Sequence, residues 1–140
     1  MNNLRRTVAF AVIVPLASVG LLAAPSVADT PKTYHHAANG RTVTVHKGAT
    51  IRIDLATSAD GGYTWAIVEG KHSPKFKVVS NKLDFPSTPG VVGGTAHTVI
   101  TLKATARGNA TVKALERRSF DKSDVIARFT LHLHVVKPAK

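Results

Sequence analysis

The residues of this chain that best suit chemistry are its seven histidines. His132 and His134 alternate with apolar residues, so they project from one face of the same predicted strand, an arrangement that suits a metal ion. His46 and His97 could lie on neighbouring strands. Spacing identifies no third or fourth ligand, and paired histidines are common on the solvent-facing side of strands. We therefore expect no metal site.

The sequence also offers little that would activate a nucleophile. It contains no cysteine, which excludes thiolate nucleophiles, thiolate metal sites and disulfides. No G-x-S-x-G pattern occurs. The eight acidic residues are scattered over predicted loops and exposed strand positions, which does not suit a pair of carboxylates for acid and base catalysis. We predict that the protein is not an enzyme and uses no cofactor.

Residues 1–28 have the organisation of a secretory signal peptide. Arg5 and Arg6 precede an uncharged apolar run, Thr7–Ala24, and the small residues Ser26 and Ala28 fit a signal-peptidase site. We expect cleavage after Ala28 and an extracytoplasmic product, either secreted or associated with the cell envelope. An uncleaved membrane anchor is the alternative, although a proline and a glycine interrupt the apolar run.

The charge of the remaining chain is strongly positive. Without the first 28 residues it holds 17 Lys and Arg against 8 Asp and Glu, a net charge of +9. Outside the cytoplasm such a charge favours anionic cell-envelope polymers or acidic proteins as partners, rather than nucleic acid. We expect no membrane contact after cleavage, and a monomer.

Alternation of apolar and polar residues, the signature of strands with one buried face, begins at Thr42. Residues 29–41 show no such period and are expected to form a flexible N-terminal tail. Residues 81–94, with two prolines and three glycines, are predicted to form a long loop, and Gly108-Asn109 a hairpin turn. The predicted strands are 42–46, 51–55, 63–69, 76–80, 95–106, 110–116 and 126–136.

This pattern favours an all-β fold over residues 42–136. Seven or eight short strands with regular turn signals and no amphipathic helix are typical of an immunoglobulin-like antiparallel β-sandwich. A small barrel is the alternative. Trp65 is expected in the core.

Three segments resemble the loops of one known family, the chagasin-like inhibitors of papain-type cysteine proteases. Ser58 to Trp65 is similar to the family's N-P-T-T-G-[YF]-x-W loop, with Gly62, Tyr63 and Trp65 matching. Val91 to Thr95 resembles its G-x-G-G loop, and Arg118-Ser119-Phe120 its R-P-[WF] loop. The order of the three segments and the strands between them agree with the family from Thr42 to Val136.

The resemblance implies an immunoglobulin-like sandwich with three loops at one end, which enter the active-site cleft of a papain-like cysteine protease as a reversible, competitive block. Glycine-rich loops let the backbone approach a narrow cleft, and a rigid sandwich has little ordering entropy left to lose. The protease-binding residues carried over on this basis are Ser58, Ala59, Asp60, Gly61, Gly62, Tyr63, Val92, Gly93, Gly94, Arg118, Ser119 and Phe120.

The tips of these loops depart from the family pattern. Asp60 places a negative charge where the family has a hydroxyl, so it could pair with the catalytic imidazolium or be repelled by the thiolate. Val91 and Ser119 replace a glycine and a proline. The alternative function is therefore a basic envelope-binding or adhesion module on the same fold that has lost inhibition.

Overall fold

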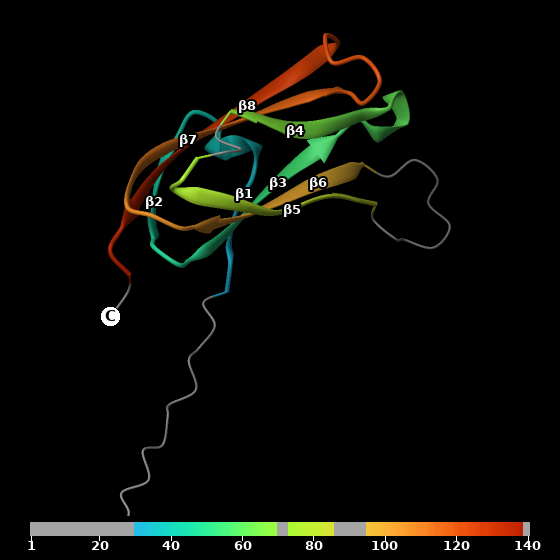
Figure 1. Cartoon of the computed structure of the whole chain (residues 1–140). Coiled ribbons are helices and arrows are strands. Elements are labelled where there is room, and N and C mark those ends of the chain that lie inside the picture. Colours follow the sequence, from blue (N-terminus) through green and yellow to red (C-terminus); the bar gives the residue numbers. More distant parts are fainter. Residues whose placement is uncertain (1–29, 70–72, 86–94, 139–140) are drawn as a thin grey trace, which may run out of the picture.

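The computed structural model describes residues 30–69, 73–85 and 95–138 of the 140-residue chain (Figure 1). The predicted signal peptide and the segment Val92–Gly94 lie outside the described residues. Within those residues, no helix has the length and apolar character needed to cross a membrane.

Eight strands and two short 3-10 turns make up the described chain. The 3-10 turns are η1, His36–Ala38, and η2, Ala59–Gly61. The strands are β1 (Lys32–Tyr34), β2 (Thr42–His46), β3 (Thr50–Thr57), β4 (Tyr63–Glu69), β5 (Phe76–Asp84), β6 (Ala96–Ala104), β7 (Gly108–Arg118) and β8 (Val125–Val136).

The strands form two four-stranded sheets that pack as an immunoglobulin-like sandwich, which confirms the predicted fold class (Figure 1). One sheet has the order β1-β3-β6-β5 and the other β2-β8-β7-β4. The expectation of purely antiparallel sheets is wrong, because β1 pairs in parallel with β3, and β2 in parallel with β8. Each parallel pair involves a short edge strand, so the four long central strands keep antiparallel ladders.

Alternation along the strands places the apolar residues between the two sheets. In β8, Phe129, Leu131, Leu133 and Val135 are buried, whereas the residues between them are more exposed. Trp65 of β4 is 3% exposed and lies in this core, as predicted. The sandwich is therefore held by side-chain packing between its inner faces, without disulfides.

The N-terminal segment 29–41, expected to be a flexible tail, is structured over most of its length. β1 pairs with β3 from Lys32↔Ile51 to Tyr34↔Ile53, and η1 follows it. Tyr34 and Ala38 are buried and belong to the core. The segment is too short to show a period of two, so the sequence does not predict its burial. That burial depends on contacts with distant strands.

The boundaries of β5 and β7 also differ from the prediction. β5 continues to Asp84, four residues into the predicted loop, because it pairs with β6 as far as His97. β7 begins at Gly108, so Gly108 and Asn109 lie in the strand rather than in a turn, opposite Val135 and His134. β7 then extends to Arg118, two residues beyond the prediction.

Candidate functional site

The β3–β4 and β7–β8 loops lie side by side at one end of the sandwich (Figure 1). β4 and β7 are antiparallel neighbours, with Tyr63 opposite Arg118 in the register. The first residue of β4 is therefore fixed next to the last residue of β7. We call residues 58–63 and 118–124 the loop end. The third predicted loop segment, Val92–Gly94, falls outside the described residues.

The first loop is a tight turn built around η2. The backbone N–H groups of Gly61 and Tyr63 both donate to the carbonyl oxygen of Ser58, at 3.2 and 3.4 Å, and that of Gly62 donates to Ala59 at 2.9 Å. Gly62 ends the turn with φ +76°, a left-handed conformation that favours glycine. Ser58, Asp60 and Gly61 are exposed, so this turn presents two short polar side chains and the bare backbone of Gly61 to solvent.

Arg118 connects the two loops. Its Nε donates to the carbonyl oxygen of Gly61 at 3.2 Å, and its guanidinium forms an ion pair with Asp124 at 3.2 Å. The guanidinium carbon also lies 5.0 Å from the ring centre of Tyr63 and 5.7 Å from that of Phe120. One side chain thus contacts both loops and both aromatic rings.

Asp124, the ion-pair partner of Arg118, also binds Tyr63. The Tyr63 hydroxyl donates to Asp124 Oδ2 at 2.9 Å. This hydrogen bond to the carboxylate, more than desolvation, raises the pKa of Tyr63 above its ordinary value. In the same loop, hydrogen bonds from the hydroxyl and backbone N–H of Ser123 lower the pKa of Asp121.

Phe120 is the most exposed large apolar side chain among the described residues, at 79%. Its ring lies over the first loop, because a Cβ added at Gly62 would stand 3.3 Å from Phe120 Cε1. The Ser119 backbone N–H also reaches the Gly62 carbonyl oxygen, at 3.4 Å. An exposed aromatic ring beside a glycine turn suits the recognition of another protein, since aromatic side chains contribute much of the binding energy at interfaces.

Sequence reasoning missed Glu116, a buried residue of β7 that binds the backbone of the first loop. We expected the acidic residues in loops and on exposed strand positions, but Glu116 is only 5% exposed. Its Oε1 accepts a hydrogen bond of 2.6 Å from the backbone N–H of Ser58. The alternation Val112, Ala114, Glu116 indicates this inward position, although not its partner. Asp124, the partner of Tyr63 and Arg118, carried no signal in the sequence.

The histidines considered as metal ligands are held by other partners. His132 Nδ1 lies 3.1 Å from Thr111 Oγ1, and His134 Nδ1 lies 2.6 Å from Asn109 Oδ1. His46 and His97 belong to different sheets, not to neighbouring strands. In the part of the chain that the structure describes, no three histidine or carboxylate side chains gather as metal ligands would.

Comparison with known proteins gives one family match and several similar structures. The family described as chagasin family peptidase inhibitor I42 matches residues 44–135. No curated protein sequence matches the chain.

Two solved structures share the fold at low sequence identity. The solution structure of amebosin is 20% identical, with a TM-score of 0.64 over 76% of this chain and 99% of that protein. The crystal structure of the cysteine protease inhibitor EhICP2 from Entamoeba histolytica is 18% identical, with a TM-score of 0.62 over 75% of this chain and 94% of its own. Because the family match spans residues 44–135 and so covers most of the sandwich, the chain belongs to the chagasin family of peptidase inhibitors.

Proposed function

We propose that the protein is a secreted inhibitor of papain-like cysteine proteases, which places the loop end in the active-site cleft as a reversible, competitive block. Membership in a family of peptidase inhibitors supports inhibition as the activity. The similar structure from Entamoeba histolytica is a cysteine protease inhibitor, which supports the class of protease.

The observation that carries this proposal is the link that Arg118 makes between the two loops. Its contacts with Gly61, Asp124 and both aromatic rings hold the glycine turn and Phe120 in one arrangement. A surface ordered before binding loses less conformational entropy when it enters a cleft. Gly61 and Gly62 carry no side chain, so their backbone can approach a narrow cleft closely. Ser58, Ala59, Asp60, Tyr63 and Ser119 complete the proposed contact surface, together with Val92, Gly93 and Gly94.

Secretion is part of the proposal and has its own test. The basic and apolar segments of residues 1–28, followed by small residues, support export and cleavage after Ala28. Mass spectrometry of the exported protein should find an N-terminus at Asp29. Retention of residues 1–28 in the exported protein would instead support the membrane anchor.

The activity is tested by titrating the purified protein into papain and into a cathepsin L-type protease while following hydrolysis of a fluorogenic peptide. We expect competitive inhibition that is reversed on dilution. Absence of inhibition at tens of micromolar would contradict the proposal.

Phe120→Ala tests the proposed surface. We expect the inhibition constant to rise at least about tenfold, because a central aromatic contact at an interface typically contributes about 2 kcal/mol or more. The free energy of unfolding should stay unchanged, since this side chain is almost fully exposed. Val79→Ala, at an exposed apolar position of β5, is the matched control and should leave inhibition unaltered. Equal constants for both variants would exclude Phe120 from the interface.

A further inference from the structure

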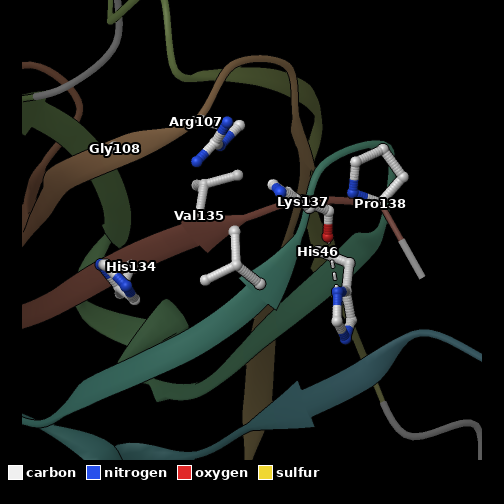
Figure 2. A pocket seen from close by; sticks show the side chains of 8 residues that line it. His46, Arg107, Gly108, His134, Val135, Lys137 and Pro138 are labelled. Atoms are coloured by element: carbon white, nitrogen blue, oxygen red, sulfur yellow. Dashed lines mark hydrogen bonds between the residues drawn. The ribbon is translucent and has the colours of Figure 1, made fainter. Parts of the chain in front are cut away.

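We propose that the end of the sandwich opposite the loop end binds a linear, phosphate-bearing polyanion. A shallow pocket of about 660 Å³ opens there, where β2 and β8 end and β7 begins (Figure 2). Arg107, Lys137, His46 and His134 line it around the apolar floor of Val135 and Val136. Every ionisable side chain of this lining is therefore basic.

Two further lysines stand beside the pocket. Lys47 directly follows β2, and its backbone N–H donates to the carbonyl oxygen of Val136 at 3.0 Å. Lys75 reaches the first residue of β7, because a Cβ added at Gly108 would stand 2.9 Å from Lys75 Cε. Gly108 has φ +120°, a conformation that favours glycine, and it carries no side chain that would displace Lys75. We call Lys47, Lys75, Arg107 and Lys137 the basic end.

Among the described side chains, the carboxylates lie away from these cations. Among the described residues, Asp54 forms ion pairs with His35 and His97, and Asp124 with Arg118, none of which belongs to the basic end. The other carboxylates with described side chains are at or near the loop end: Asp60, Asp84, Glu116 and Asp121. Cations gathered on one surface attract a polyanion and raise its association rate.

The two imidazole rings of the pocket are held in fixed orientations. His46 Nδ1 lies 2.7 Å from the carbonyl oxygen of Lys137, which can only accept, so Nδ1 carries the hydrogen (Figure 2). His134 Nδ1 is held in the same way by Asn109 Oδ1 at 2.6 Å. Both rings therefore leave Nε2 as the nitrogen available to a ligand.

The spacing of the cations favours a polymer over a single ion. Lys47, Lys75, Arg107 and Lys137 come from four separate segments around the pocket rather than from one turn. An open pocket does not surround one phosphate, whereas separated cations match phosphates repeated along a chain. Phosphate also suits Arg107, whose planar guanidinium can donate two parallel hydrogen bonds to it.

A polymer held here would leave the loop end free. β8 begins at the loop end and finishes at the pocket, so its twelve residues separate the two surfaces by about 35 Å (Figure 1). If the proposed function holds, the protein can inhibit a protease while tethered to an anionic polymer. Polymer binding itself does not depend on inhibition.

The test is calorimetric titration of the purified protein with sodium polyphosphate and, separately, with inorganic phosphate. We expect polyphosphate to bind at least a hundredfold more tightly than inorganic phosphate, and its affinity to fall steeply as salt increases. Chemical-shift changes should concentrate at residues 104–108 and 134–138. Inorganic phosphate that binds as tightly as polyphosphate would overturn the assignment to a polymer.

Paired charge reversals locate the site. Arg107→Glu with Lys137→Glu should weaken polyphosphate binding at least tenfold. The control, Lys77→Glu with Lys82→Glu, changes the net charge by the same amount at exposed positions of β5. It should weaken polyphosphate binding less than threefold. Equal losses in the two variants, or no binding by the unchanged protein, would overturn the proposal. If the first variant does not fold, Arg107→Gln with Lys137→Gln replaces it under the same criteria.

A protease assay at saturating polyphosphate completes the test. Unchanged inhibition is expected if the two surfaces act independently. Competition between polymer and protease would overturn the separation of the two surfaces. A protein that binds polyphosphate but does not inhibit would contradict the proposed function alone.

Discussion

Gly40 and Gly62 share the same left-handed backbone angle, φ +76°, but have different surroundings. A Cβ at Gly40 would meet nothing within 4 Å, whereas one at Gly62 would press on the ring of Phe120. The two positions therefore separate backbone strain from a steric effect on the proposed binding surface.

We predict that Gly40→Ala and Gly62→Ala each lower the free energy of unfolding by about 1 kcal/mol, the usual cost of a side chain in this conformation. Only Gly62→Ala should also weaken protease inhibition, because the new methyl group displaces Phe120. Urea denaturation and inhibition constants measure the two effects. Weaker inhibition by both variants would show that backbone strain alone, without displacement of Phe120, lowers inhibition.

Tyr63 provides a prediction at alkaline pH. Because Asp124 raises its pKa in the folded state above 10.0, this hydrogen bond stabilises the fold fully below pH 10 and stops doing so as pH rises through the folded pKa. The ultraviolet absorbance of tyrosinate should therefore show Tyr63 titrating above pH 10, with Tyr63→Phe identifying its signal among the two tyrosines. Asp124→Asn should lower this pKa. An unaltered titration in that variant would contradict the assigned cause.

At the scale of elements, β7 links the core to the loop end through the side chains of Glu116 and Arg118. Glu116 points inward and accepts a hydrogen bond from Ser58, whereas Arg118 contacts the exposed loop residues. One strand thus holds the first loop at two points, Ser58 and Gly61.

We predict that Glu116→Ala destabilises the protein by about 1–3 kcal/mol, because it leaves the Ser58 backbone N–H without its acceptor. Glu116→Gln keeps an acceptor oxygen at this position, so its free energy of unfolding should fall by less. Hydrogen exchange at Ser58 is the more direct readout, and should accelerate in the alanine variant. Exchange at Ser58 that is as slow in the alanine variant as in the unchanged protein would show that Glu116 does not hold the loop.

At the scale of the whole molecule, the N-terminal segment completes the sandwich. β1 adds to the sheet of β3, β6 and β5, and β2 adds to the opposite sheet, so the chain crosses from one sheet to the other between them. Tyr34 and Ala38 lie on this path and are buried in the core.

We predict that Tyr34→Ala lowers the free energy of unfolding by about 3 kcal/mol, as is typical when a buried aromatic side chain is removed. Thr33→Ala, at the exposed neighbouring position, should change it by less than about 0.5 kcal/mol. Urea denaturation measures both. A tail that does not contribute to the fold would give two equal, small changes.

The sequence by itself determined the class of fold and most of the strands, because burial of one face imposes a period of two that is visible residue by residue in β2, β3, β4 and β8. It also indicated the loop residues through their resemblance to a family.

Only the tertiary structure decided the parallel pairings, the burial of residues 32–38 and the partners of Arg118. These depend on contacts between residues far apart in the chain, such as Tyr63 with Asp124 and Ser58 with Glu116. Local periodicity carries no information about which strands become neighbours. The same reason explains the basic end, where Lys47, Lys75, Arg107 and Lys137 come from four separate segments that meet only when the two sheets close.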